Sequence, residues 1–121
     1  MATVWTTVGK GIATARIKGT GTEPAYVAIG TGAGTAVIGD TTLFTEVETR
    51  ALGTSTRQTT TTTNDTYQVV GTVAITAPRA ITNAGLFDAA TVGNLFVKGD
   101  FSVINLGAGD SIQLTIKLSF T

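Results

Sequence analysis

The sequence has no cysteine and no histidine, and only 2 of its 121 residues are proline. Without cysteine, the chain can form neither disulfides nor thiolate metal sites. Without histidine, it lacks the commonest general base and metal ligand of proteins. The serines have no histidine to activate them as nucleophiles; they are Ser55, Ser102, Ser111 and Ser119. We therefore expect no enzyme, no catalytic residue, no metal site and no cofactor.

Charge is also scarce, because only 13% of the residues are charged, against a usual share of about 25%. Eight basic residues balance eight acidic ones and form no run, whereas nucleic-acid-binding faces cluster lysine and arginine. No apolar run approaches the roughly 18 residues that span a membrane, and residues 1–11 lack the pattern of a signal peptide. We expect folding in a cytoplasm, and neither nucleic acid, membrane nor small-molecule substrate as a partner.

What the sequence does have is threonine and glycine, at 26 and 15 residues, with 42% hydrophobic residues. Threonine is β-branched and suits a pleated, half-exposed surface. The length fits one hydrophobic core. We therefore predict one domain over residues 1–121. Its expected fold is all-β, an antiparallel β-sandwich (jelly-roll-like) of seven or eight strands, with one short helix and an extended N-terminal arm over residues 1–11.

Alternation of apolar and polar residues marks the expected strands. It is strict over residues 111–120 and predicts an antiparallel strand with one buried face. The same period predicts long strands over 66–77 and 95–104, the latter with a bulge at Gly99 and Asp100. Shorter strands are expected over 13–18 and 25–30. Five consecutive threonines at 59–63 predict an exposed strand or extended loop.

Residues 40–52 are the only segment that predicts a helix. Asp40 to Thr42 can supply an N-cap, and Glu46 with Arg50 forms an i,i+4 pair of opposite charge. Three apolar residues follow at helical spacing, namely Leu43, Val47 and Ala51. A helix of one to three turns is expected here.

Residues 81–89 combine turn chemistry with two large apolar residues. Thr82, Asn83 and Gly85 are typical of a turn, so we predict a corner there. Leu86 and Phe87 are expected to begin the next strand, with at least one pointing into the core. Asp88 is expected to tie the hairpin that follows over residues 89–93.

Two further patterns invite a functional interpretation. Residues 30–34 form a glycine-rich loop after a strand, where phosphate loops lie, but match neither common phosphate-binding spacing, so we interpret them as a strand connection. A carboxylate pair for glycoside hydrolysis, or a calcium site, stays open among the acidic residues without a supporting spacing. These acids are Glu23, Asp40, Glu46, Glu48, Asp65, Asp88, Asp100 and Asp110.

Trp5 is the single tryptophan and lies in a threonine-rich segment. One interpretation makes it an aromatic residue at the edge of the core. The other makes it an anchor on an extended arm that docks into a neighbouring subunit, because tryptophan is a frequent interface hot spot. On the second interpretation, the candidate intersubunit or capsid contacts are Val4, Trp5 and Val8.

Four segments occur in a fixed order: "AYVAIGTG", "TTLFTEVETRA", "AITNAGLFDAATVGNLFVKGDF" and "GAGDSIQLTIKLSF". From about residue 25 to the end, they resemble a family of small virion proteins of tailed bacteriophages, and also the N-terminal regions of tail-collar fibre proteins. Asn83 departs from the pattern, because the family often has glutamate there. The positions that match are Ile29, Gly30, Leu43, Glu46, Arg50, Thr82, Gly85, Leu86, Phe87, Asp88, Gly109 and Asp110.

The resemblance implies a structural virion protein. We expect a capsid decoration (cement) protein that binds the outside of the head, with the major capsid protein and itself, as a homotrimer, for partners. Its expected location is the capsid surface of the virion, after assembly in the bacterial host cytoplasm. The alternative is a tail, collar or baseplate fibre-type protein for host attachment. A carbohydrate-binding sandwich, with Trp5, Tyr26 and Tyr67 as stacking aromatics, rests on fold analogy alone.

Overall fold

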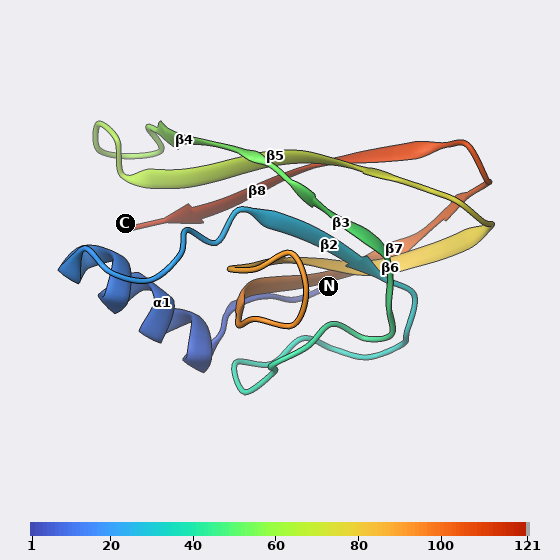
Figure 1. Ribbon diagram of the computed structural model, residues 1–121, viewed down its shortest axis with the longest axis horizontal. Coiled ribbons are helices and arrows are strands. Elements are labelled where there is room, and N and C mark those ends of the chain that lie inside the picture. The colour runs from blue at the N-terminus through green and yellow to red at the C-terminus, as the bar shows by residue number, and fades with distance from the viewer. Residues whose placement is uncertain (121) are drawn as a thin grey trace.

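The computed structural model describes residues 1–120, which contain one helix and eight strands (Figure 1). They are β1 (Thr3–Trp5), α1 (Thr7–Lys18), β2 (Tyr26–Gly30), β3 (Glu46–Leu52), β4 (Thr54–Gln58), β5 (Thr66–Ala74), β6 (Arg79–Phe87), β7 (Leu95–Leu106) and β8 (Ser111–Ser119). A five-stranded sheet has the order β1-β7-β6-β2-β3, and a three-stranded sheet has the order β4-β5-β8. All paired strands are antiparallel. The predicted all-β antiparallel sandwich is confirmed.

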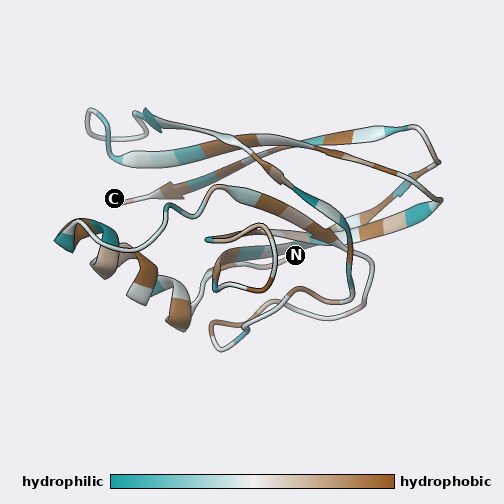
Figure 2. Ribbon diagram, in the orientation of Figure 1, coloured by the Kyte–Doolittle hydropathy of each residue, from teal (hydrophilic) through white to brown (hydrophobic). Residues whose placement is uncertain are grey.

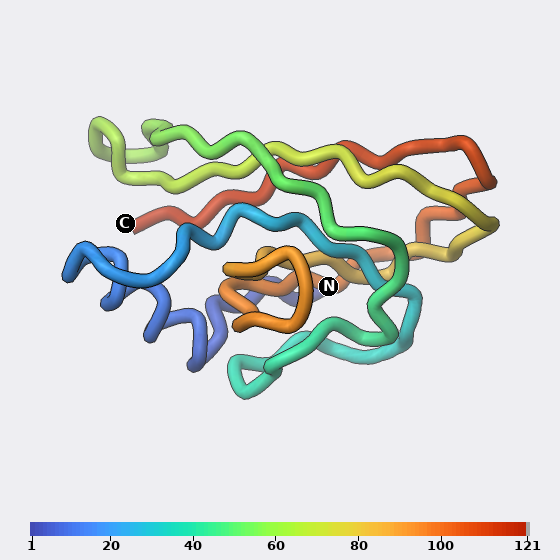
Figure 3. Tube along the Cα trace, viewed as in Figure 1, coloured from blue at the N-terminus to red at the C-terminus, as the bar shows by residue number. Residues whose placement is uncertain are grey.

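The two sheets are joined at one end and along one side. The connections β5–β6 and β7–β8 turn at the same end of the molecule, and α1 lies at the opposite end (Figure 3). Between β3 and β4 the chain passes from one sheet to the other at Gly53, where a Cβ atom would overlap the side chain of Val69. Since β3 and β4 close that side, the opposite side, with β1 and β8 at the sheet edges, stays open.

The core lies between the sheets, and β5 carries hydrophobic segments that contribute to it (Figure 2). Val69 and Val73 of β5 are at most 1% exposed and face Val27 and Ile29 of β2 in one cluster. A second, smaller cluster contains Ala28, Leu43, Phe87 and Leu95. Because Ala28 alternates with Val27 and Ile29 along β2, this cluster lies on the outer face of the five-stranded sheet. That sheet is therefore covered on both faces.

The predictions for the long strands are confirmed. Residues 66–77, 111–120 and 25–30 contain β5, β8 and β2, and residues 95–104 form most of β7, which continues to Leu106. The irregularity expected at Gly99 and Asp100 begins directly after them, because Asn83 pairs with Asp100 but Ile81 pairs with Ile104. The threonine run forms the loop between β4 and β5. There the Asp65 carboxylate accepts hydrogen bonds from the backbone N–H groups of Thr60, Thr61 and Thr62.

The helix predicted over residues 40–52 is wrong, because residues 46–52 form β3. Val27 and Ile29 are two residues apart on β2, but their partners Ala51 and Val47 are four residues apart on β3. Two extra residues therefore bulge out of β3, with Glu48 at a φ of 66°. Residues four apart, such as Val47 and Ala51, lie on one face of any strand. The bulge shortens the strand between such residues and so brings Glu46 within 2.8 Å of Arg50. It thus reproduces in a strand the spacing that predicted a helix.

The strand predicted over residues 13–18 and the extended arm predicted over residues 1–11 are also wrong, because the helix α1 and strand β1 lie there. Thr6 is the N-cap residue, and its Oγ1 atom accepts a hydrogen bond from the N–H of Gly9 at 2.9 Å. The same hydroxyl reaches the carbonyl of Leu95 at 2.7 Å. Gly19, at a φ of 86°, ends the helix. Only Gly9 and Ile12 of α1 are buried, so its apolar stripe was too narrow to predict a helix.

The corner predicted at residues 81–89 is wrong too, since residues 81–87 lie within β6, which pairs with β7 and β2. Leu86 and Phe87 also do not begin the next strand, because they are the last two residues of β6. The predictions that at least one of them points into the core and that Asp88 ties the following hairpin are confirmed. Leu86 and Phe87 are 1% and 2% exposed, in the main and the smaller cluster respectively. Asp88 ties the following turn, because its Oδ1 atom accepts a hydrogen bond from the N–H of Asn94 at 2.7 Å.

Candidate functional site

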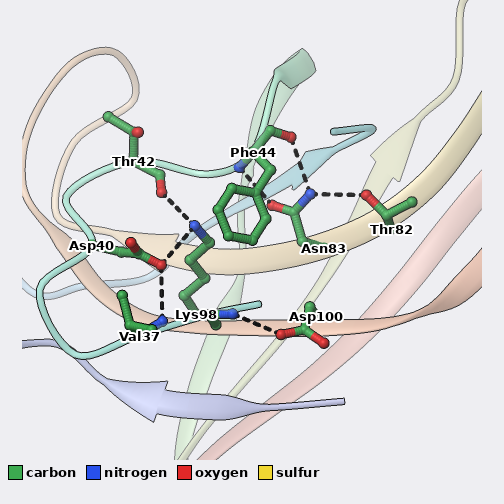
Figure 4. Close-up of polar contacts among 9 residues, drawn as sticks. Val37, Asp40, Thr42, Phe44, Thr82, Asn83, Lys98 and Asp100 are labelled. Carbon is green, nitrogen blue, oxygen red and sulfur yellow. Dashed lines mark hydrogen bonds and ion pairs between the residues drawn. The ribbon is translucent and has the colours of Figure 1, made fainter. Parts of the chain in front are cut away.

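Two loops cover the outer face of the five-stranded sheet: loop 31–45, between β2 and β3, and loop 88–94, between β6 and β7. Figure 4 shows the side chains from β6 and β7 that reach loop 31–45. Asn83 is fully buried, and its Oδ1 atom accepts a hydrogen bond from the Phe44 N–H at 3.0 Å. Its Nδ2 group donates to the Phe44 carbonyl at 3.0 Å and to Thr82 Oγ1. One amide side chain thus satisfies both backbone groups of a loop residue.

Lys98 holds the same loop through its charge. Its side chain is buried, with Nζ 3.0 Å from the Asp40 carboxylate and 2.9 Å from the carbonyl of Thr42. Nζ also lies 3.3 Å from the centroid of the Phe44 ring, a cation–π contact. Burial raises the pKa of the Asp40 carboxyl, but hydrogen bonds from the Val37 N–H and from Lys98 outweigh it and leave this pKa below its ordinary value.

Asp100 joins this loop to the N-terminal segment. Its two carboxylate oxygens accept hydrogen bonds from the N–H of Ala36 at 2.8 Å and the N–H of Ala2 at 3.1 Å. These bonds, that of Ala36 first, hold the pKa of Asp100 below its ordinary value. The Thr7 N–H also donates to the carbonyl of Ile38 at 2.7 Å. Loop 31–45 is therefore fixed to both β7 and the start of α1.

Arg50 holds loop 88–94. Its guanidinium donates to the carbonyls of Ala89 and Val92, at 2.9 and 2.7 Å, and forms a bidentate pair with Glu46. The guanidinium carbon lies 3.5 Å from the centroid of the Phe87 ring. Planar stacking together with forked hydrogen bonding is specific to arginine, which fixes this side chain and the loop it holds.

Both loops display apolar residues although their backbones are tightly held. Val37 and Ile38 are 54% and 59% exposed, and Val92 is 84% exposed. Val92 also has a φ of 56°, in the left-handed region that β-branched residues rarely adopt. Such strain costs about 1–3 kcal/mol, and it persists only where surrounding contacts enforce it. The hydrogen bond from Arg50 to the carbonyl of Val92 is one such contact.

A second surface feature is the groove on the open side of the sandwich, between β1 and β8. It has a volume of about 340 Å³, and its lining includes Val4, Trp5, Phe101, Leu114 and Ile116. The Trp5 ring packs edge-on against Phe96 and Phe120, with centroid distances of 6.2 and 5.6 Å. Within residues 1–120, the buried indole Nε1 atom has no hydrogen-bond partner.

The structure brings most of the sequence-predicted positions together around β6. Arg50, Glu46, Phe87 and Asp88 form or hold loop 88–94, and Leu43 packs with Phe87. Thr82 donates to the carbonyl of Gly32 in loop 31–45, while Ile29, Gly30, Gly85 and Leu86 are buried in the sheet. Gly109 and Asp110 lie apart, in the β7–β8 turn, where Asp110 accepts a hydrogen bond from the Gly107 N–H.

The candidate contacts Val4, Trp5 and Val8 are only partly brought together. Val4 and Trp5 lie on β1 beside the groove, whereas Val8 lies in the first turn of α1 and does not line it. All three are half-buried. Trp5 packs at the edge of this chain's own core, and its part in an intersubunit contact stays a prediction.

Sequence reasoning missed Lys98 and Phe44, and treated Asn83 as a turn residue. A lysine flanked by "LFV" on its N-terminal side is unusual enough in a buried strand to have predicted a paired charge. Nothing in the sequence points to Phe44 as its neighbour, since the two are far apart along the chain.

Among the described residues 1–120, no group of three or more acidic, histidine or cysteine side chains could hold a metal ion. The only helix in that range is too short and too polar to cross a membrane. Comparison of the chain with protein-family models, curated proteins and solved structures found no match.

The Asn83→Ala variant should lose about 1–3 kcal/mol of unfolding free energy, because it leaves the N–H of Phe44 without a partner beneath a loop and its carbonyl with only the bond from the Gly32 N–H. Chemical denaturation measures the change. The matched control is Thr35→Ala, at an exposed position of the same loop, which should change stability by less than about 0.5 kcal/mol. Equal effects of the two substitutions would show that Asn83 does not hold the loop.

Glu48 gives the fold a specific dependence on pH. Its carboxylate accepts hydrogen bonds from the Thr76 N–H at 3.0 Å and Oγ1 at 2.8 Å, and pairs with Arg79 at 3.0 Å. The Thr76 N–H, followed by Arg79, lowers the pKa of Glu48 from 4.5 to about 2. A depressed pKa stabilises the folded state above the unfolded pKa, and this contribution is lost as the pH falls through the folded pKa.

The Tm of the native chain should therefore exceed that of Glu48→Gln most strongly above pH 4.5, and the difference should shrink as the pH falls toward 2. Taking the difference between the two proteins removes the contributions of the other carboxylates. Calorimetry at stepped pH values measures it. A Tm difference that stays constant across this range would contradict the role of the Glu48 carboxylate.

Proposed function

We propose that this chain is a bacteriophage capsid decoration protein, which binds the outside of the head and stabilises contacts between major capsid protein subunits. The observation that carries the proposal is the pair of loops 31–45 and 88–94. Buried polar side chains hold both loops, and both expose apolar residues. Loops held in advance lose little conformational freedom when they bind, so more of the contact energy appears as affinity.

The resemblance to phage virion proteins supports the proposal independently, because the positions that carry it build these loops. Arg50 and Phe87 hold loop 88–94, and Thr82 contacts loop 31–45. A cementing protein works by burying apolar area across joints between subunits, at about 25 cal/mol per Å² before association costs. The exposed Val37, Ile38 and Val92 supply such area.

Val92 is the sharpest position for a test. Asparagine tolerates the left-handed conformation, so Val92→Asn relieves the strain at a φ of 56°. We expect Val92→Asn to raise the unfolding free energy of the free protein by up to about 1 kcal/mol. The same substitution removes the exposed apolar tip, so its binding to heads should weaken. Stability and binding should therefore change in opposite directions.

The binding experiment uses purified protein and expanded, undecorated heads, and measures the bound amount and the melting temperature of the heads. The native chain should bind and raise that temperature. Ile38→Lys and Val92→Asn should bind less, whereas the control Leu52→Lys, at a position 68% exposed but on neither loop, should bind normally. Failure of the native chain to bind heads would overturn the proposal. The copy number in virions distinguishes this proposal from the tail alternative. The copy number of a head protein rises with that of the major capsid protein, whereas the copy number of a tail protein does not.

A further inference from the structure

Strand β8 presents a long, regular edge with no neighbour. It pairs with β5 over nine consecutive positions, from Ser111 opposite Ala74 to Ser119 opposite Thr66, with no bulge. Within residues 1–120, no strand lies on its other side. Backbone N–H and C=O groups along that side are a template for pairing with a further strand.

The other sheet edges are blunted in ways that β8 is not. β1 has only three residues and β4 only five, and β3 carries the bulge at Glu48. Short length, bulges and charge are the usual protections of an edge strand. β8 has nine residues, no proline and one charged residue, Lys117.

The pattern of polar and apolar residues in β8, "SIQLTIKLS", is the same when the strand is read backwards about Thr115. An antiparallel pair of two such strands, centred on Thr115, places like residue classes opposite each other. The facing pairs would be Ser111 with Ser119, Ile112 with Leu118, Gln113 with Lys117, Leu114 with Ile116, and Thr115 with itself. Lys117 then faces Gln113 and never another lysine, so no like charges meet directly.

The two faces of β8 fit this pairing as well. Exposed residues alternate strictly with half-buried apolar ones along the strand, and the apolar ones pack against the core. A partner strand in the same register continues both faces, polar outside and apolar inside. It would lie along the groove that Leu114, Ile116 and Trp5 line. The half-buried apolar side chains of β8 would then be covered further.

We propose that a second copy of this chain pairs with β8, strand to strand and antiparallel, about a two-fold axis at Thr115. The three-stranded sheets of the two copies thereby join into one continuous sheet. The partner is identified by the self-complementary sequence of the edge. This inference concerns the free protein and does not depend on the proposed function, so its failure and failure to bind heads are separate results.

The first test uses disulfide trapping, because the chain has no cysteine of its own. Directly opposite residues of an antiparallel pair have Cβ atoms about 4.5–5.5 Å apart, which allows an inserted cysteine pair to cross-link with small adjustment. Under mild oxidation, Thr115→Cys should form a covalent dimer. The control Thr72→Cys, at an exposed position of the central strand β5, should not. A mixture of Gln113→Cys and Lys117→Cys should cross-link to each other and neither to itself.

The second test introduces a negative or a positive charge at one exposed position. Gln113→Glu places a carboxylate opposite Lys117 of the other copy, and Gln113→Lys places a like charge there. Sedimentation equilibrium should show the dimer dissociation constant falling about fivefold in Gln113→Glu and rising about fivefold in Gln113→Lys. Opposite changes at one exposed site distinguish pairing from a general effect on stability.

Three results would overturn the proposal. The first is a native chain that stays monomeric at about 100 μM. The second is equal cross-linking of Thr115→Cys and Thr72→Cys. The third is a free protein with the mass of three chains, since a two-fold pair through β8 closes with two.

Discussion

Replacing Leu86 or Phe87 with alanine should lower the unfolding free energy by about 2–5 kcal/mol. The two neighbours are 1% and 2% exposed on opposite faces of β6, so each substitution opens a cavity in a different cluster. Leu86→Ala removes contacts between the sheets. Phe87→Ala removes the packing beneath the two outer loops, and also the ring on which Arg50 stacks.

Chemical denaturation with a fixed m-value measures these losses. The matched control is Leu52→Ala, the same change at a position 68% exposed, which should cost less than about 0.5 kcal/mol. Phe87→Leu separates the two roles of Phe87, because leucine fills most of the space but offers no aromatic face to Arg50. Losses below about 0.5 kcal/mol for both alanine variants would show that this part of β6 is exposed.

Gly9→Ala should destabilise the protein by about 3 kcal/mol, whereas Gly11→Ala should stabilise it by up to about 1 kcal/mol. Both glycines lie in α1, where alanine is the better helix former. A Cβ atom at Gly9 would overlap the carbonyl oxygen of Phe96, which is backbone and cannot rotate away. A Cβ atom at Gly11 meets nothing within 4 Å.

The two variants isolate the close approach of α1 to β7, because they share helix, residue type and substitution. Thermal denaturation followed by circular dichroism should give melting temperatures that move in opposite directions. Stabilisation by both substitutions would mean that α1 does not rest on β7 as described. Destabilisation by both would mean that the glycines are needed for the flexibility of the helix and not for its contact with Phe96.

The sequence was sufficient to predict the sandwich and its long strands, because period-two alternation is strict over the nine residues of β8 and recognisable along β5. It failed where a local pattern has two structural solutions. In β3, the bulge at Glu48 gives a strand the same i,i+4 relation between Glu46 and Arg50 as a helix would. In α1, Gly9 permits close packing on β7, but it and Gly11 both lower the helix propensity of the segment, so propensity did not indicate a helix there.

The sequence predicted which residues belong to the site better than it predicted how they are arranged. Arg50, Phe87 and Asp88 were singled out, but the sequence could not show that they lie around one loop. Such contacts join residues far apart in the chain, as the sequence separation of 39 between Arg50 and Ala89 illustrates. Asn83 was missed for a different reason. Asparagine is typical of turns, and the sequence cannot distinguish a turn asparagine from one that bonds to a buried backbone, as Asn83 does here.

The pairing of β1 with β7 fixes the order in which the fold can be completed during synthesis. Thr3 pairs with Gly99, and the cap residue Thr6 bonds to the carbonyl of Leu95. At about 5–20 residues per second, β7 follows β1 from the ribosome only after about 5–20 s. Until then β1 has no partner strand and the N-cap of α1 lacks its contact with Leu95. The earliest part of this chain to be made is therefore among the last to reach its place.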